Sequence, residues 1–273
     1  RCLQLSRQNM IQKISRNLFN IFALFTREPF VRYFSRELEF YSNGNNSTIG
    51  LITFDLTDED YSCVILSRDN SRQFRAENIK VDIPTIGKAR NWIVDNLNES
   101  RIIKHDNESK YFDLFKKVVK DEQLHPYFEL LKNHIGYSSA KEVIEEVAYH
   151  YKDIDGNFIQ QFQSMNGFDA RLWEIYLFCF FREESFSFKR NSHSPDFSVS
   201  KLGHELAIEA VILSNKEKEI NKIKLRDFTP KSLDEIKKKL ENEIPIRFGS
   251  ALFDKMKKKY WEKDHVKGKP FLI

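Results

Sequence analysis

The segment 192–215, SHSPDFSVSKLGHELAIEAVILSN, contains Glu205 beside a turn and two further carboxylates, Asp196 and Glu209, in runs typical of β-strands. Asp196 follows Pro195 at the start of one run, and Glu209 interrupts the apolar run LAIEAVIL. A lone carboxylate in an apolar strand is costly unless it is neutral, meets a cation or binds a metal. The segment therefore predicts a buried ion pair or a metal site.

The turn KLGH between the two runs predicts that they pair as antiparallel strands. This pairing would bring Asp196 close to the C-terminal half of the second strand, where Glu209 lies. Two carboxylates that converge at the edge of a sheet offer the oxygen ligands that Mg²⁺ and Mn²⁺ prefer. We therefore expect Asp196 and Glu209 to share a divalent ion.

Each acid also has a plain structural interpretation. Asp196, after a proline, can cap a turn. Glu209 can be the buried partner of Arg171, Arg190 or a C-terminal lysine. Glu174 is the only charge within LWEIYLFCFF, and it can pair with Arg171 three residues earlier on a helix. These interpretations stay open beside the metal site.

Apolar periodicity predicts the elements that position these residues. Residues 168–184 are apolar on nearly every side, which indicates a buried helix. Three strands follow, and the last of them, ELAIEAVILS, is apolar on both faces and should be central in its sheet. The remaining elements are basic helices near 231–243 and 249–263 and a final strand KPFLI. The predicted order is α-β-β-β-α-β.

The motif PD at 195–196, followed after twelve intervening residues by EAV at 209–211, resembles the PD-(D/E)XK nuclease superfamily, which has the restriction-endonuclease-like fold. The resemblance extends over about residues 168–273 and implies an α/β protein with a mixed sheet in its C-terminal core. It implies that Asp196 and Glu209 are metal ligands and that the backbone carbonyl of Ala210 completes the metal site. It also implies an assisting role for Glu174 on the first core helix.

The chain departs from the family at the lysine that belongs two residues after the second acid, because Val211 stands there. Some members of the superfamily supply this lysine from the helix after the three strands. In this chain the segment GSALFDKMKKKYW places Lys255 and Lys259 on one flank of an apolar stripe, with Lys258 further round. We expect Lys255 or Lys259 to act on the phosphate, and Lys216 is a less favourable substitute.

An α+β region with a possible role in sensing or recognition is predicted for residues 1–157, before a nuclease domain over 158–273. We expect this region to contain a helix over 1–28, strands within 30–83, a helix after Pro84 and three helices between 100 and 151, the first being YFDLFKKVVK. The final KGKPFLI resembles the start of a strand, so we expect more protein to follow and the nuclease domain to be truncated at its C-terminus.

Composition narrows the function classes. The chain is 41% hydrophobic and 14% aromatic, which is typical of a globular protein. No apolar run approaches the ~20 residues that span a bilayer. The cysteines at 2, 63 and 179 form no CxxC pair, which favours a reducing cytoplasm over a disulfide framework or a zinc ribbon. Residues 216–273 hold 17 Lys and Arg against 10 Asp and Glu, a local excess compatible with a polyanionic partner.

These observations predict a cytoplasmic endonuclease that cleaves DNA with Mg²⁺ or Mn²⁺, with no membrane association. A homo-oligomer stays open, and a role in restriction or bacterial anti-phage defence is expected by analogy. Because Val211 replaces the family's lysine, the alternative is a catalytically inactive member of the fold that binds nucleic acid or a protein. A protein with no site, acting only through interactions, is the third interpretation.

Overall fold

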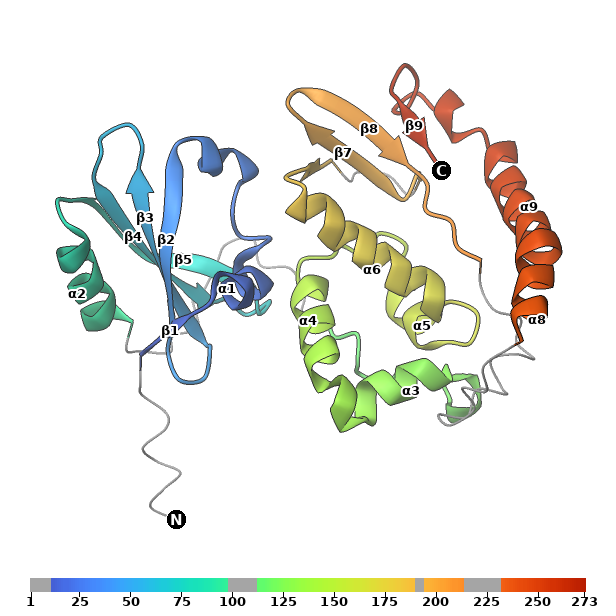
Figure 1. Ribbon diagram of the computed structural model, residues 1–273, viewed down its shortest axis with the longest axis horizontal. Coiled ribbons are helices and arrows are strands. Elements are labelled where there is room, and N and C mark those ends of the chain that lie inside the picture. Colours follow the sequence, from blue (N-terminus) through green and yellow to red (C-terminus); the bar gives the residue numbers. More distant parts are fainter. Residues whose placement is uncertain (1–10, 98–111, 190–193, 214–231) are drawn as a thin grey trace, which may run out of the picture. The chain divides into compact units, whose positions relative to one another are not determined.

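The computed structural model describes residues 11–97, 112–189, 194–213 and 232–273. Within these residues the chain is a mixed α/β protein with two sheets (Figure 1). No helix of the described part is long and apolar enough to cross a membrane.

The chain forms two compact units, and neither is a continuous stretch of sequence. The first unit comprises Arg1–Asp113 and Val143–Tyr151, and the second comprises Leu114–Glu142 and Lys152–Ile273. The sequence predicted a single boundary after residue 157, whereas the contacts divide the chain at three places. The predicted boundary falls a few residues from the last of these divisions.

A five-stranded antiparallel sheet forms the centre of the first unit, and its strands lie side by side in the order of the sequence. They are β1 (Gln12–Ile14), β2 (Ser35–Ser42), β3 (Thr48–Asp55), β4 (Tyr61–Arg68) and β5 (Phe74–Ile83). The predicted strands within 30–83 are thus confirmed.

The two faces of this sheet are covered by two helices, α1 (Arg16–Ala23) and α2 (Ile86–Asn96). Phe19 of α1 is buried in a cluster with Leu51, whereas Ile93 of α2 is buried in a cluster with Ile52. Successive side chains of a strand point to opposite faces, so the two helices pack on opposite sides of β3. A short 3₁₀ helix, η1 (Pro29–Tyr33), precedes β2.

The helix predicted over residues 1–28 is much shorter than expected. Residues 1–10 lie outside the described residues, and β1 pairs with β2 through Gln12–Ile14 instead of continuing a helix. Ser15 then begins α1, because its hydroxyl accepts a hydrogen bond from the Leu18 backbone N–H at 3.2 Å. The pairing of β1 with β2 and the Ser15 cap therefore fix the start of the helix at Arg16, although the apolar periodicity extends further towards the N-terminus.

The helix predicted at YFDLFKKVVK is also wrong, since residues 112–120 form turns and bends. The buried side chain of Gln163 provides the reason. Its amide donates to the carbonyls of Leu114 and Lys116 at 2.9 and 2.8 Å, and it accepts from the Val118 N–H at 2.9 Å. These bonds satisfy backbone groups that a helix would otherwise pair within itself.

A four-stranded mixed sheet forms the centre of the second unit. Its strands are β6 (Ser187–Phe188), β7 (Phe197–Lys201), β8 (His204–Ile208) and β9 (Phe271–Leu272). They lie in this order, with β6, β7 and β8 antiparallel and β9 parallel to β8. The prediction for ELAIEAVILS was too long: β8 ends at Ile208, so Glu209 follows the strand instead of lying inside it.

The helices of the second unit precede and follow this sheet. They are α3 (Pro126–Asn133), the first part of α4 (Ser138–Ala148), α5 (Phe158–Gln163), α6 (Phe168–Glu183), α8 (Leu233–Lys238) and α9 (Ile244–Lys257), with a π-helical turn η4 (Lys239–Glu243) before α9. Short 3₁₀ turns lie at η2 (Asp121–Gln123), η3 (Ile135–Tyr137) and η5 (Tyr260–Glu262).

Helix α6 covers one face of the sheet through aromatic contacts. The ring of Phe181 lies 5.7 Å from that of Phe197 on β7, and the ring of Phe178 lies 4.6 Å from that of Phe188 on β6. The expectation that α6 is buried on nearly every side is wrong, because Trp173, Tyr176 and Phe180 are exposed.

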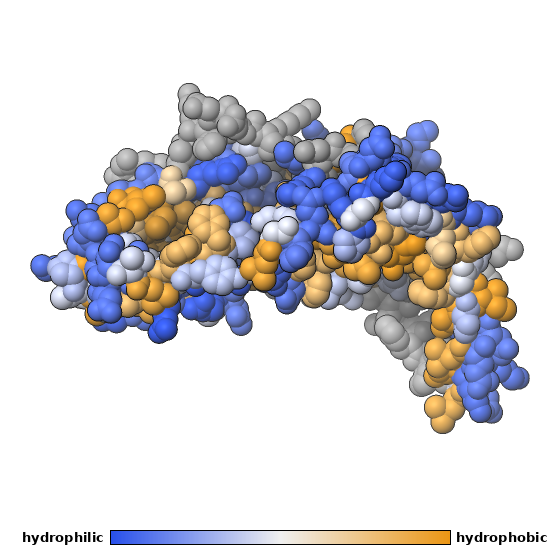
Figure 2. Space-filling model, turned by 90° about the horizontal axis from the view of Figure 1, so that it is seen from above, coloured by the Kyte–Doolittle hydropathy of each residue, from blue (hydrophilic) through white to orange (hydrophobic). Residues whose placement is uncertain are grey.

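The basic segment after the sheet forms a helical stretch that begins with a capping box, in which Ser232 and Glu235 each bond the other's backbone. The right-hand end of Figure 2, where α8 and α9 lie in Figure 1, shows apolar side chains on one side and hydrophilic side chains on the other. This pattern is typical of amphipathic helices.

Candidate functional site

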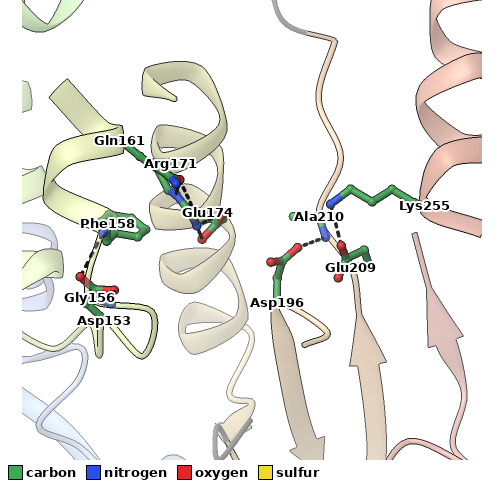
Figure 3. Close-up of polar contacts among 10 residues, drawn as sticks. All are labelled: Asp153, Gly156, Phe158, Gln161, Arg171, Glu174, Asp196, Glu209, Ala210 and Lys255. Atoms are coloured by element: carbon green, nitrogen blue, oxygen red, sulfur yellow. Dashed lines mark hydrogen bonds and ion pairs between the residues drawn. The ribbon is translucent and has the colours of Figure 1, made fainter. Parts of the chain in front are cut away.

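The register of β7 and β8 places Asp196 and Glu209 opposite each other. Phe197 pairs with Ile208 as the last pair of this ladder, and Asp196 and Glu209 are the next residue on either side. Opposite residues of an antiparallel pair project to the same face of the sheet. Figure 3 shows both carboxylates at the same end of these strands.

Backbone hydrogen bonds hold both acids in place. The Ala210 N–H donates to Oδ2 of Asp196 at 2.7 Å, so the side chain of Asp196 bridges the two strands. The Glu209 N–H donates to the carbonyl of Leu272 at 2.9 Å, which extends the contact with β9. The turn cap suggested for Asp196 is therefore a cross-strand bond.

Glu209 is 3% exposed and has two differently placed oxygens. Its Oε1 lies 2.6 Å from the ammonium of Lys255, which reaches the sheet from α9 (Figure 3). Its Oε2 is buried and has no hydrogen-bond partner among the described residues. An unpaired buried carboxylate oxygen costs free energy, because it has lost water and gained nothing in exchange.

Burial raises the pKa of Glu209 above its usual range, the nearby charge of Asp196 adds to this rise, and Lys255 opposes it. Burial also opposes the charge on Lys255, but the hydrogen bond and charge of Glu209 outweigh it, so the pKa of Lys255 is raised. The two directions differ in sense, since one favours a neutral acid and the other a charged lysine. Both shifts have a common cause in Asp196, a second negative charge that repels Glu209 and attracts Lys255.

A pocket of about 420 Å³ opens beside this pair. Four residues that the sequence singled out line it together: Glu174, Asp196, Ala210 and Lys255. Val211, which occupies the position of the family's lysine, lines the same pocket. The volume falls in the range of small-molecule sites, about 300–1,000 Å³.

Glu174 pairs with Arg171, which is the partner that the structural interpretation of the sequence predicted. The Arg171 guanidinium donates to both of its oxygens, at 2.6 and 2.8 Å, and Glu174 is 6% exposed. Nε of Arg171 also donates to the side-chain carbonyl of Gln161 at 2.7 Å (Figure 3). Glu174 is thus fixed on the pocket wall by neighbours from α5 and α6.

The two lysines proposed for the site lie in different surroundings. Lys255 reaches Glu209, whereas Lys259 lies past the end of α9, with a side chain that is 61% exposed and 3.2 Å from Glu262. The pocket wall of α9 is instead formed by Ala251, Asp254 and Lys255, with Lys258 just beyond the helix. Their spacing of three, four and seven residues is a helix face that the sequence could have indicated.

The donor set suits Mg²⁺ better than an ion that needs many side-chain ligands. Within the described residues, no group of three or more His, Cys, Asp or Glu side chains could hold a metal ion. Mg²⁺, however, is commonly bound by one or two carboxylates and several waters. Asp196 and Glu209, opposite each other at the ends of β7 and β8, are two such carboxylates. Oε2 of Glu209 has no hydrogen-bond partner among the described residues.

Two alternatives named from the sequence, Arg190 as a partner of Glu209 and Lys216 as a substitute lysine, lie outside the described residues. Scans against protein-family models, curated proteins and solved structures each found no match to this chain. The site is therefore interpreted from its own residues.

Proposed function

We propose that the second unit is a metal-dependent nuclease with a restriction-endonuclease-like core, and that it hydrolyses phosphodiester bonds of DNA. The element order α6, β6, β7, β8, α8–α9, β9 supports this proposal, as does a sheet in which three antiparallel strands are followed by one parallel strand. This is the arrangement that the resemblance to the PD-(D/E)XK superfamily implies.

The observation that carries the proposal is the buried Oε2 of Glu209, which no described residue bonds and which lies across the strand pair from Asp196. A purely structural acid at this position would be expected to have both oxygens satisfied. Here the protein retains a carboxylate whose charge is opposed both by burial and by a second carboxylate. A divalent cation between the two acids would remove both costs.

A few residues in and beside the pocket then have parts in the reaction. Asp196 and Glu209, with the carbonyl of Ala210, would hold Mg²⁺ or Mn²⁺, and the bound ion would supply an activated water and charge neutralisation at the phosphate. Lys255 carries a positive charge at the pocket wall, where it can orient Glu209 and stabilise the negative phosphate. Arg171 holds Glu174 in position on the opposite wall.

Lys255 could also take the place of the lysine that the family has at the position of Val211. It comes from the helix after the three strands and meets the second acid at 2.6 Å. The same contact favours one rival, since a buried Glu–Lys pair needs no metal. The rival is an inactive member of the fold that binds nucleic acid or a protein partner.

A cleavage assay separates the two functions. The full chain is incubated with plasmid DNA and with a labelled single-stranded DNA, in Mg²⁺, in Mn²⁺ and in EDTA. We expect cleavage that requires the metal and that falls at least a hundredfold in Asp196→Asn, because even residues behind the metal ligands cost 10–100-fold when replaced.

Asp254→Asn is the matched control, because it makes the same charge change on the wall of the same pocket. We expect it to retain activity within a few-fold of the unmodified chain. Cleavage that persists in EDTA or in Asp196→Asn would refute the metal site. A chain that binds DNA but cleaves neither substrate would establish the rival function.

The setting of this activity, restriction or defence against phage in the cytoplasm with the first unit sensing the target, stays a prediction. It could be tested by phage challenge of cells that express the chain or its Asp196→Asn variant.

A further inference from the structure

Three aromatic side chains on α6 are exposed instead of being buried in the core. Trp173, Tyr176 and Phe180 are 37%, 56% and 41% exposed. We call these three residues the α6 ladder. Their spacing of three and then four residues places them on one face of the helix, away from the buried Ile175 and Phe178.

The rings of the α6 ladder are nearly parallel. Trp173 and Tyr176 have ring centres 5.2 Å apart and planes inclined by 12°, and Tyr176 and Phe180 have centres 6.4 Å apart and planes inclined by 14°. At 1.5 Å per residue, the ladder runs for about 10 Å along the helix. That length corresponds to about three stacked nucleotides at 3.4 Å each.

The ladder begins at the candidate site. Trp173 lines the same pocket as Glu174, Asp196 and Lys255, so one end of the aromatic row borders the carboxylates and the other leads away from them. An exposed cluster of aromatic residues that continues a pocket is a common mark of a binding surface.

The wall of the pocket opposite α6 includes Lys255 and Lys258, which belong to a basic segment with aromatic residues of its own. Seven lysines and only two acids, Glu262 and Asp264, lie between residues 255 and 269. The ammonium of Lys257 lies 4.5 Å from the ring centre of Phe253, and that of Lys263 lies 4.6 Å from the ring centre of Tyr260. Lysines can follow a phosphate backbone, while exposed rings can stack on bases.

We infer that the α6 ladder is a stacking platform for the unpaired bases of single-stranded DNA, whose backbone follows the lysine-rich wall into the pocket. A second protein would use the apolar area of the rings, but it would not need the lysine wall beside them. The bases of a duplex are paired and stacked on one another, so their faces could not reach the rings. The inference rests on the proposed nuclease function for the placement of the scissile phosphate at Asp196.

Binding is measured by fluorescence anisotropy in EDTA, so that no cleavage occurs. The probes are a labelled 20-nucleotide single strand without self-complementarity and the duplex of the same sequence. We expect Tyr176→Leu, which keeps an apolar side chain but removes the ring, to weaken single-strand binding about tenfold or more, since one base–aromatic stack is worth about that factor. Duplex binding should change little.

Two controls isolate stacking. Tyr176→Phe keeps the ring and should bind the single strand within about twofold of the unmodified chain. Tyr137→Leu makes the same substitution at another exposed tyrosine of this unit, 43% exposed and not part of the pocket, and should also leave binding unchanged. Light scattering of each variant reports the oligomeric state.

The outcomes also separate this inference from the proposed nuclease. Unchanged single-strand binding in Tyr176→Leu overturns the platform, and so does a dimer of the unmodified chain that dissociates in this variant. In either case, metal-dependent cleavage lost in Asp196→Asn would leave the nuclease standing. Conversely, ring-dependent binding without any cleavage would support the platform and refute the nuclease.

Discussion

Glu39 in the first unit and Glu209 in the second are both buried acids, 7% and 3% exposed, but their partners differ. Both oxygens of Glu39 are bonded: the Arg90 guanidinium donates to them at 2.6 and 3.0 Å, and the Tyr41 hydroxyl donates at 2.5 Å. Lys13 adds a contact at 2.9 Å. Glu209 has one lysine on one oxygen and no partner for the other among the described residues.

The pKa values follow this difference. Hydrogen bonds from Arg90 lower the pKa of Glu39 to about 2, against the effect of burial. Burial and Asp196 raise the pKa of Glu209. The two shifts are opposite because the hydrogen bonds outweigh burial at Glu39, whereas burial and Asp196 outweigh Lys255 at Glu209. A fully bonded acid stabilises its fold, whereas an acid with an unbonded oxygen keeps a coordination position available.

The largest expected difference in stability between the two units appears when each of the two acids is replaced by glutamine. Glu39→Gln should lower the free energy of unfolding of the first unit by about 2 kcal/mol, because bonds to a charged acceptor are lost. Glu209→Gln should cost the second unit less, under about 1 kcal/mol, because it removes a carboxylate whose charge is opposed by burial and by Asp196, and because Lys255 is partly exposed and keeps Asp196 as a nearby negative charge. Equal losses at both positions would contradict the contrast.

Each unit can be followed separately in this experiment. The chain has three tryptophans, and Trp92 belongs to α2, whereas Trp261 packs against Phe271 of β9 with ring centres 5.8 Å apart. Urea unfolding is therefore measured by fluorescence in two backgrounds that each retain one of these tryptophans, with phenylalanine at the other positions.

The response to acid should also differ. The pKa of Glu39 is lower in the folded chain than in the unfolded chain, so its stabilisation is present above pH 4.5 and is lost as the pH falls towards 2. The full shift would correspond to about 3 kcal/mol, and we expect about 2 because Arg90 is half exposed to solvent. Glu39→Gln should flatten the pH dependence of Trp92-monitored unfolding over this window, whereas Glu205→Gln, in the other unit, should leave it unchanged.

Removing the cation from Glu209 sharpens the contrast further. Lys255→Met should destabilise the second unit by about 2 kcal/mol at pH 8, because it leaves a buried carboxylate without a counter-charge. Since the folded pKa of Glu209 is raised, the loss should shrink as the pH falls and the acid becomes neutral. The double variant Lys255→Met, Glu209→Gln should recover most of the stability, and the absence of such recovery would show that Lys255 acts mainly through packing.

The smallest expected effect is that of the metal itself. At a Mg²⁺ concentration about five times its dissociation constant, the second unit should gain about 1 kcal/mol, measured as a rise in the Trp261-monitored midpoint. Glu209→Gln should remove this gain, and the first unit should not respond. Equal responses to Mg²⁺ and to the same ionic strength of NaCl would contradict a specific site.

Several of these features could be predicted from the sequence. The pairing of PDFSVSK with ELAIEAVILS was predictable, because a short turn between two apolar runs allows few alternatives. The contact of Glu209 with a lysine of the following helix was among the interpretations left open, because a buried acid must find a cation or neutralise.

Other features depend on contacts between residues far apart in the chain. Gln163 bonds the backbone 45 to 49 residues earlier, and no local pattern in YFDLFKKVVK reveals that partner. Asp196 bonds the backbone of Ala210, which is visible only once the register is known. The exposed rings of α6 were missed because an apolar helix normally indicates burial on all sides, and hydropathy does not distinguish core side chains from apolar side chains that are exposed.

The chain passes between the two units three times, near residues 113, 142 and 151. A single proteolytic cut in any of these passages therefore cannot leave both units covalently whole, since a cut near residue 113 separates Val143–Tyr151 from the rest of the first unit and a cut near residue 151 separates Leu114–Glu142 from the rest of the second. Deleting residues 143–151 to isolate the second unit would also strip the first of Glu146, which forms an ion pair with Arg68 at 2.6 Å. A continuous fragment that holds the whole of one unit therefore always carries a segment of the other.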